Sequence, residues 1–366
     1  MVFDRTVPYN ALPKLPPVQE IDTKNILKLA ISANRALAEL KTRGSLLPNQ
    51  NLLIDSLVFL EAKDSSEIEN IFTTHDKLYQ SDAIEEVADH YTKEVQRYRE
   101  ALWGGIASIK TRPLSTNTFI EVVQTIKENQ SGIRTTQGTK ISSTTGEIIY
   151  TPPEGQRLLA DLLQNLEHYL HEADDVDPLI KMAVLHYQFE AIHPFADGNG
   201  RAGRIMNILY LLQEKRLEVP VLFLSNYFLR NKIPYYKGLQ NVTEHGQWEE
   251  WILYILKAIE TTSYETMARI DAIRQAMEKF QATMLKEVPK IYTKDLLEVL
   301  FEQPYCRIQS LVNRGIAKRV TASTYLQKLQ DAGLLEAKKF SHYVVYLNPV
   351  LMDVLRKPAE ELTKLA

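Results

Sequence analysis

The chain has 366 residues, with 45% hydrophobic and 24% charged side chains, a composition that lets a globular protein bury a core and a length that suggests two or three domains. The formal net charge of −3 excludes a general attraction to nucleic acid or acidic membranes, so any such affinity must be local. One cysteine excludes internal disulfides, and the lack of a signal-peptide pattern or an apolar run of about 18 residues predicts a cytoplasmic protein with no membrane partner.

The first twenty residues contain four prolines, which block helices and strand ladders alike and predict an extended arm lying on another part of the chain. A helix should follow from Asp22, a candidate N-cap, to Lys41, with a turn over residues 44–51. The next helical pattern runs towards the hexapeptide from Ser65 to Asn70, Ser-Ser-Glu-Ile-Glu-Asn. Taken alone, serines with a glutamate a few residues on are an ordinary helix-start pattern.

Residues 84–110 carry apolar side chains spaced for one face of a helix, and residues 116–129 predict another short helix. Over residues 131–153 the pattern changes to short apolar stretches on either side of Thr145-Gly146, which predicts a β-hairpin. On sequence alone, this hairpin is expected to be exposed to solvent.

A twelve-residue run from His193 to Arg204, HPFADGNGRAGR, lies between two helical patterns. Apolar side chains recur every three or four positions over residues 178–192, and they do so again over residues 205–212. The run is therefore predicted to be a loop between two helices, and its last residues should open the second helix.

Each residue type in this run has a use around phosphates. The backbone N–H groups from Gly198 to Arg201 would lie at a helix N-terminus, where unpaired donors and the helix dipole favour an anion. Arg201 and Arg204 can each fork onto phosphate oxygens, and Asp197 is a hard oxygen ligand that suits Mg²⁺ on phosphates. His193 can accept a proton near neutral pH. Together these residues suggest nucleotidyl or phosphoryl transfer to a hydroxyl.

The glycines at 198, 200 and 203 also fit the GxGxxG pattern of dinucleotide-binding proteins and protein kinases. Both of those classes need a strand directly before the glycines. Because the preceding segment is predicted to be helical, both classes are rejected.

The run resembles the signature HPFx[D/E]GNGRxxR of the Fic (filamentation-induced-by-cAMP) family and matches it at every position. The resemblance implies a helical core that transfers AMP from ATP to a Ser, Thr or Tyr hydroxyl of a protein, including the chain itself. It implies that His193 is the base and that Asp197 holds Mg²⁺. The nucleotide-binding residues that it implies in this run are Gly198, Asn199, Gly200, Arg201, Ala202, Gly203 and Arg204. Relatives that phosphorylate tend to carry Lys where this chain has Gly200, so the glycine favours transfer of AMP.

The resemblance also gives the hexapeptide a role. Ser65, Glu69 and Asn70 fit the family's inhibitory motif, [S/T]xxxE[G/N]. In the family this glutamate pairs with the second motif arginine, here Arg204, and keeps the γ-phosphate of ATP from seating productively. Because the hexapeptide precedes the core, the resemblance is to the class with an N-terminal inhibitory helix.

Two further features take a meaning from the family. The hairpin, over residues 132–150, corresponds to a flap on which the protein substrate docks by main-chain pairing. Asn231 corresponds to a residue lying against the nucleotide base, with Tyr235 or Tyr236 beside it, although such tyrosines are by default core residues. The resemblance leaves open whether the chain forms a homodimer.

The C-terminal part has a different pattern. Residues 260–286 lack Pro and Gly and predict a spacer helix, and beyond it three short helical patterns and a strand-like stretch resemble a winged helix-turn-helix domain. Residues 307–339 carry seven Lys or Arg against two Asp or Glu, which suits contact with DNA phosphates. A protein-docking surface explains this basic face equally well, because the third helix offers few side chains that read bases.

The predicted organisation is an N-terminal arm with helices over 1–100, a Fic core over 101–262, a linker helix over 263–286 and a winged-helix domain over 287–355. The fold class is mostly α, with a β-hairpin flap. The predicted function is an autoinhibited protein adenylyltransferase that uses ATP and Mg²⁺. The alternative is a nucleotide-sensing, DNA-binding transcriptional regulator, which would bind duplex DNA and turn over no ATP.

Overall fold

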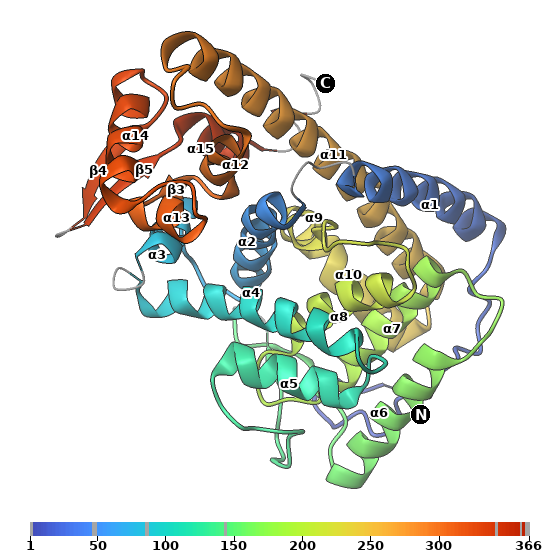
Figure 1. Cartoon of the computed structure of the whole chain (residues 1–366). Helices are drawn as coiled ribbons and strands as arrows, with labels where there is room; N and C mark the ends of the chain where they lie inside the picture. Colours follow the sequence, from blue (N-terminus) through green and yellow to red (C-terminus); the bar gives the residue numbers. More distant parts are fainter. Residues whose placement is uncertain are drawn as a thin grey trace.

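The computed structural model describes residues 3–45, 50–84, 88–142, 145–340, 343–358 and 361–362, without the side chains of residues 45, 50–53 and 55. Most of the described residues are helical and the strands are short, which confirms a mostly α-helical fold (Figure 1). None of the described helices is long and apolar enough to cross a membrane.

The N-terminal helices are α1 (Lys24–Ser45), α2 (Gln50–Ile68), α3 (His75–Ala83) and α4 (His90–Ile109). The middle of the chain forms α5 (Thr116–Lys127), β1 (Ile141–Ser142), β2 (Ile148–Tyr150), α6 (Gln156–His171), α7 (Pro178–Ile192), α8 (Asn199–Gln213), α9 (Leu224–Arg230) and α10 (Lys232–His245). The remainder forms α11 (Trp248–Glu287), α12 (Lys294–Glu302), β3 (Tyr305–Cys306), α13 (Ile308–Asn313), α14 (Arg319–Asp331), β4 (Glu336–Phe340), β5 (Tyr343–Leu347) and α15 (Pro349–Arg356).

The helix predicted over 84–110 is shorter than expected at its start. Helix α4 begins at His90 because Asp89 lies in extended backbone and its side chain accepts a hydrogen bond from the Thr92 N–H, which caps the helix. Helix α3, which was not predicted, begins after a similar cap at Thr74. Residues 85–87 lie outside the described residues, as do residues 46–49 of the predicted turn.

Helix α7 forms the centre of the core and carries the histidine motif at its end. Its side chains are buried on nearly all sides, so it reads as an apolar helix without a polar face. Asp177 caps its start, with Pro178 at the first helical position, where a missing N–H costs nothing. The indole Nε1 of Trp251 on α11 donates a hydrogen bond to the Ala183 carbonyl, 2.8 Å away, and locks α7 to α11.

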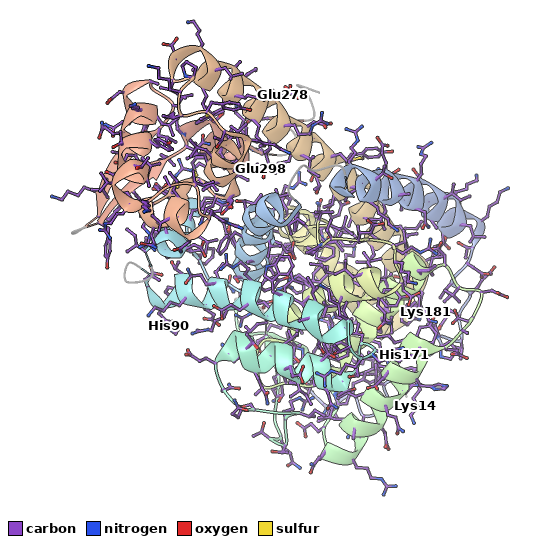
Figure 2. The ribbon with its side chains drawn as sticks, in the orientation of Figure 1. Lys14, His90, His171, Lys181, Glu278 and Glu298 are labelled. Carbon is purple, nitrogen blue, oxygen red and sulfur yellow. The ribbon has the colours of Figure 1, made fainter. Side chains whose placement is uncertain are left out.

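Helix α11 is one continuous helix of 40 residues, where the sequence suggested a core stripe followed by a separate spacer. Neither Pro nor Gly interrupts it. Its first half is buried in the core around Trp251, and its second half is buried among the C-terminal elements around Phe280 and Met284. The predicted boundary between core and linker, at residue 262, therefore falls inside a single helix. Buried apolar side chains form one cluster that includes both halves, and side chains fill the space between the helices (Figure 2).

The proline-rich arm lies on the core, as predicted. Its Tyr9 N–H donates to the Thr151 carbonyl at 3.0 Å, next to strand β2, and the Pro13 carbonyl accepts a hydrogen bond from Gln188 of α7 at 2.8 Å. The β-hairpin is also present: β1 and β2 pair antiparallel, with Ile141 opposite Tyr150. The Tyr150 hydroxyl donates to the Ala191 carbonyl at 2.7 Å, so the hairpin is anchored beside the end of α7.

The C-terminal elements form a small unit of three helices, an antiparallel sheet in the order β3-β5-β4 and the closing helix α15. The three short helices and the last strand were predicted, whereas β3, β4, α15 and, in the core, α6 were not. Figure 1 shows this unit next to α2 and α3, far from α6. Its likeness to a winged helix remains a prediction.

Candidate active site

The histidine motif forms the loop between α7 and α8, as predicted. His193 ends α7 in left-handed backbone with φ 49°, and its N–H still donates to the Phe189 carbonyl at 3.0 Å. Arg134 braces the loop from the segment before the hairpin: its Nε donates to the His193 carbonyl at 2.8 Å and one terminal nitrogen donates to the Pro153 carbonyl at 2.5 Å. No sequence pattern predicted this role for Arg134.

Asn199 closes the loop internally. Its side-chain oxygen accepts a hydrogen bond from the Phe195 N–H at 2.8 Å, and its side-chain nitrogen donates to the Phe195 carbonyl at 2.8 Å. The side chain is buried, so its two polar atoms are committed to Phe195. The predicted contact of Asn199 with a nucleotide therefore depends on its backbone N–H.

The start of α8 presents the anion-binding geometry. Gly198 adopts φ 87°, which suits glycine, and the N–H groups of Asn199, Gly200 and Arg201 lie in the first turn, where a helix has no acceptors of its own. These donors and the helix dipole favour a phosphate at this point.

Ala202 and Gly203 lie deeper in α8. The Ala202 N–H already donates to the Gly198 carbonyl at 3.0 Å. At Gly203 an added Cβ would lie 2.5 Å from Glu190 Oε1 and 3.2 Å from the Phe189 ring. Glycine is needed at position 203 because α7 and α8 pack closely there. Direct contact of Ala202 and Gly203 with a nucleotide remains a prediction.

Arg204 is held by the hexapeptide. The guanidinium is 2% exposed; its Nε donates to Ser65 Oγ at 2.8 Å, and one terminal nitrogen contacts the Ser65 carbonyl at 2.8 Å and Glu69 Oε1 at 2.7 Å. Burial alone would lower the pKa of Arg204, but the negative charge of Glu69, together with smaller contributions from Tyr235, Glu190 and the hydrogen bond to Glu69, outweighs it and the pKa is raised. The two residues lie together as the resemblance implied.

Glu69 lies just beyond the end of α2, and the backbone there explains the residue that follows it. Asn70 has φ 61°, in the left-handed region that favours Asn or Gly, and the Ile71 N–H donates back to the Ser66 carbonyl at 3.0 Å. A Cβ added at Gly200 would overlap the Glu69 carboxylate. The carboxylate thus lies against the first turn of α8, where an anion is favoured.

His193 carries a neutral imidazole. The side chain is half-buried, and its Nδ1 has no hydrogen-bond partner among the described residues. Burial, together with the positive charge of Arg134, lowers the pKa of His193 to about 4. At pH 7 the ring is therefore unprotonated and able to accept a proton.

Arg201 and Asp197 belong to a square of alternating charges that the sequence did not reveal. Arg201, 1% exposed, contacts Glu94 Oε1 of α4 at 2.8 Å, and the same oxygen contacts Lys127 Nζ of α5 at 2.9 Å. Lys127 Nζ lies 2.7 Å from Asp197 Oδ2, and Arg201 lies 3.8 Å from Asp197 Oδ1. Glu94 and Lys127 are far from the motif in sequence and resemble ordinary helix-surface charges.

Asp197 suits a magnesium ion that is held mainly by phosphates. Its side chain is 64% exposed, and no group of three or more His, Cys, Asp or Glu that could hold a metal occurs in the described ranges. Mg²⁺ commonly binds one or two carboxylates, substrate phosphates and water, so a single accessible carboxylate at an anion site fits it. Burial would raise the pKa of Asp197, but Lys127 and Arg201 outweigh it and the pKa is lowered.

The residues predicted around the base divide into core and surface. Asn231 lies between α9 and α10, where its side-chain nitrogen donates to the Tyr227 carbonyl at 2.9 Å. Tyr235 is buried, and its hydroxyl contacts His186 Nε2 at 2.9 Å, so it packs in the core and the alternative that it faces a base is not favoured. Tyr236 is 40% exposed, and Lys232 Nζ lies 5.9 Å from the centre of its ring.

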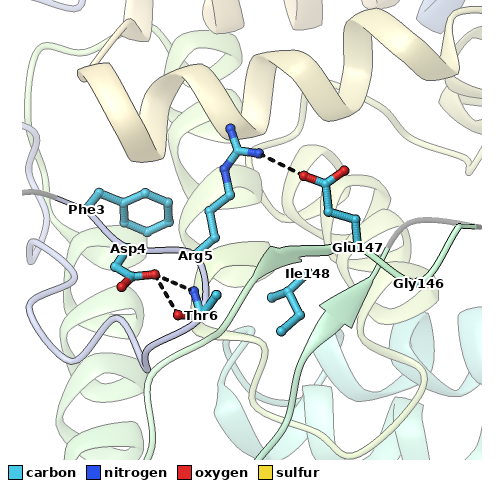
Figure 3. Close-up of a pocket in the computed structure, with 7 residues that line it drawn as sticks. All are labelled: Phe3, Asp4, Arg5, Thr6, Gly146, Glu147 and Ile148. Atoms are coloured by element: carbon cyan, nitrogen blue, oxygen red, sulfur yellow. Dashed lines mark hydrogen bonds and ion pairs between the residues drawn. The ribbon is translucent and has the colours of Figure 1, made fainter.

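The arm and the tip of the hairpin enclose a groove of about 670 Å³, shown in Figure 3. Arg5 crosses between them: its Nε contacts Glu244 of α10 at 2.8 Å, and another nitrogen lies 3.9 Å from Glu147 of the hairpin. The residues that line the groove are far from the histidine motif in sequence. The prediction that a protein substrate docks on the flap was based on the hairpin alone and did not include this groove.

Three family patterns match the chain. "Fic/DOC family N-terminal" matches residues 27–107, "Fic/DOC family" matches residues 113–211, and "Protein adenylyltransferase SoFic-like, C-terminal domain" matches residues 276–351. Between them they span the hexapeptide from Ser65 to Asn70, the histidine motif and most of the C-terminal unit.

Curated relatives match over short stretches. A probable protein adenylyltransferase of Aquifex aeolicus is 30% identical over 95 residues, which are 26% of this chain and 27% of the relative. The protein adenylyltransferase Fic of Drosophila mojavensis is 42% identical over 62 residues, which are 16% of this chain and 12% of the relative. The chain thus matches about a quarter or less of these relatives' length.

Solved structures share the fold at low identity. A Fic family protein from Desulfovibrio desulfuricans has a TM-score of 0.57 and 17% identity, with 91% of this chain and 98% of that chain covered. Fic-1 of Caenorhabditis elegans has a TM-score of 0.53 and 19% identity, with 68% of this chain and 74% of that chain covered. With a complete histidine motif, matching N-terminal, core and C-terminal patterns, and this shared fold, the chain belongs to the Fic/DOC family.

Proposed function

We propose that the chain is a protein adenylyltransferase, which transfers AMP from ATP to a hydroxyl group of a protein. One observation carries the proposal: an unprotonated imidazole and an anion-binding helix start lie at the two ends of one short loop, with an inhibitory carboxylate already against that helix start. Relatives that match part of the chain are named a probable protein adenylyltransferase and a protein adenylyltransferase, which supports the same reaction.

In the proposed mechanism the first-turn N–H groups of α8 bind the phosphates. His193 accepts the proton of the acceptor hydroxyl as that oxygen attacks the α-phosphorus. The new O–P bond forms, the bond between the α-phosphorus and the bridging oxygen breaks, and pyrophosphate leaves. Asp197 would hold a Mg²⁺ ion, which neutralises phosphate charge when it is bound.

Inhibition follows from competition for Arg204. Ser65 and Glu69 occupy the fork that Nε and one terminal nitrogen of the guanidinium form in this structure. A γ-phosphate needs the same fork, so an ATP molecule that enters while Glu69 is in place cannot seat its phosphates in line with an attacking hydroxyl. Ser65, Glu69 and Asn70 are therefore proposed as the inhibitory elements.

The protein substrate is proposed to dock along the hairpin. Strand β2 is short and is anchored through Tyr150 close to His193, so an extended acceptor segment beside it would hold its hydroxyl near the imidazole. The identity of the segment does not follow from main-chain pairing. A cytoplasmic location and a homodimer also remain predictions, as does placement of the base beside Asn231.

A second candidate function, DNA binding, is favoured by one surface. Along α14 the side chains of Lys318, Arg319, Thr321 and Lys328 are exposed, and this helix lies on the outer side of the C-terminal unit (Figure 1). Binding to a duplex through such a face would weaken steeply as salt is added. Fluorescence anisotropy of a labelled duplex at 50 and 200 mM salt tests it, and binding with no salt dependence would argue against phosphate contact.

Labelling with ATP tests the main proposal. The wild type, Glu69→Gly and Glu69→Gly/His193→Ala are incubated with a cell lysate and ATP labelled at the α- or the γ-phosphate. Label from the α-position should enter protein strongly with Glu69→Gly and weakly with the wild type, and removal of His193 should abolish it. Transfer of γ-label would indicate phosphorylation instead, and no label from either position would reject the enzyme.

A further inference from the structure

Lys127 lies in the candidate site although it is outside the motif. It is the last residue of α5, and its Nζ contacts both Asp197 Oδ2 at 2.7 Å and Glu94 Oε1 at 2.9 Å. Its methylene groups lie 3.7–3.8 Å from the position of a Cβ on Gly198, so the side chain runs over the start of the glycine-rich turn.

This contact differs from an ordinary surface ion pair. The Lys127 side chain is 24% exposed and that of Glu94 is 7% exposed, whereas exposed pairs are screened and contribute little. Glu94 also binds the buried Arg201, so a single carboxylate holds two cations beside the motif. The negative charges of Glu94 and Asp197 equal the positive charges of Lys127 and Arg201. This arrangement keeps the Lys127 ammonium next to Asp197.

The position of that ammonium has a chemical consequence. Asp197 has two oxygens: Oδ1 accepts the Gly198 N–H at 2.5 Å, and Oδ2 contacts Lys127. A divalent cation that approaches Asp197 meets Lys127 at the accessible oxygen. If the Lys127 ammonium leaves that oxygen of Asp197, Glu94 still holds the ammonium, so the positive charge of Lys127 stays beside the phosphate site.

We propose that Lys127 is a further residue of the nucleotide site, in which it occupies the cation's place on Asp197 when the site is empty and lies beside the phosphates when nucleotide binds. Glu94 is the positioning residue that retains Lys127 and Arg201. The inference rests on the proposed function for its ligand, a nucleoside polyphosphate.

The proposal predicts two opposite effects of removing the charge. Without the ammonium, a nucleotide in the absence of Mg²⁺ loses an attractive positive charge and should bind more weakly. In Mg²⁺, however, nothing competes for Asp197, so the factor by which Mg²⁺ strengthens nucleotide binding should increase. A purely structural lysine would change neither.

Calorimetry with ADP, which cannot donate AMP with release of pyrophosphate, measures both effects on the full chain carrying Glu69→Gly. Lys127→Met should weaken ADP binding in EDTA by roughly three- to tenfold, the scale of one partly buried ion pair. The factor by which Mg²⁺ strengthens ADP binding should increase by a similar amount. Lys127→Arg keeps the charge and should behave like its parent. Lys110→Met is the matched control, at an exposed lysine directly after the end of α4. It should change neither ADP binding in EDTA nor the effect of Mg²⁺ on that binding.

Two further variants make the result decisive. In an Asp197→Asn background, Lys127→Met should no longer alter the effect of Mg²⁺, because the shared carboxylate is gone. If Lys127→Met does not fold, Lys127→Gln, a slightly shorter polar side chain without the charge, takes its place. Unchanged ADP binding in EDTA, or a change that Lys127→Arg reproduces, would overturn the proposal. Failure of the proposed function is seen separately, as absent α-label transfer by the Glu69→Gly parent.

Discussion

In the proposed mechanism the chemistry depends on His193, and its charge state predicts a pH profile. Its pKa is lowered to about 4, below the ordinary 6.5, so the neutral base is present above about pH 5 and is lost as the pH falls through 4. The constant kcat/KM reports the ionisation of groups in the free enzyme. For Glu69→Gly, kcat/KM for the protein acceptor should therefore not fall as the pH is lowered from about 8 to about 6. The Glu69 charge raises this pKa, so its removal shifts the acid limb lower still. Half of the activity lost near pH 6.5 would contradict the assignment.

Asn199 illustrates a residue whose role is structural within the site. Asn199→Ala leaves the buried Phe195 N–H and carbonyl without partners, and each such group costs about 1–3 kcal/mol. The free energy of unfolding in urea should fall by about that amount. Asn313→Ala, which removes an exposed hydrogen bond on α13, should stay within about 0.5 kcal/mol of wild type. Equal losses in the two variants would show that the Asn199 contacts do not hold the loop.

The backbone at the end of α2 determines the position of Glu69, the proposed inhibitory residue. Asn70 is exposed and has φ 61°, so Asn70→Ala puts a Cβ residue into left-handed backbone at a cost of about 1 kcal/mol, whereas Asn70→Gly fits it. Asn70→Ala should raise α-label transfer by up to about fivefold over the wild type, and Asn70→Gly should leave it unchanged or lower. In a Glu69→Gly background Asn70→Ala should have no effect; an increase there would mean that the backbone acts by another route.

The elements that could be predicted are those marked by the spacing of apolar residues and by glycines in the local sequence. Helix α7, the loop after it and the hairpin follow from apolar spacing and glycine, and all three are present. Arg134, Glu94 and Lys127 could not be predicted, since each reaches the motif through a tertiary contact from another element. Helix α3 was missed because its short run of nine residues has almost no apolar periodicity and is fixed by the cap at Thr74. Arg204 and Glu69 were paired correctly because the family resemblance supplied what spacing does not.

Across the molecule, the C-terminal unit supports helix α2, which leads to Glu69, the proposed inhibitory residue. Ser56 Oγ of α2 donates to the Glu302 carbonyl of α12 at 2.5 Å, and the Tyr79 hydroxyl donates to the Ser56 carbonyl at 2.9 Å. On α3, Asp76 accepts hydrogen bonds from the Tyr305 hydroxyl and from Arg356, each at 2.8 Å. Helix α2 is therefore held between the core and the C-terminal unit.

This contact predicts that the C-terminal unit affects inhibition. Asp76→Ala leaves Tyr305 and Arg356 without that carboxylate, which should loosen α3 and α2 and raise α-label transfer several-fold in the wild type. The same substitution with Glu69→Gly should leave transfer unchanged, because no inhibitor remains to be released. Thermal unfolding of both proteins checks that the chain stays folded. Equal increases in the two backgrounds would separate the C-terminal unit from the inhibitory contact.

We infer that the first turn of α8 binds the phosphates of ATP so that His193 faces the α-phosphorus once Glu69 is removed. A crystal structure of Glu69→Gly with Mg²⁺ and a non-hydrolysable ATP analogue tests it most directly. We expect phosphate oxygens on the N–H groups of Asn199 to Arg201 and Arg204 on the terminal phosphate. The imidazole of His193 should lie within hydrogen-bond reach of a hydroxyl placed in line with the α-phosphorus. Phosphates bound away from this turn, or His193 directed away from the α-position, would contradict it.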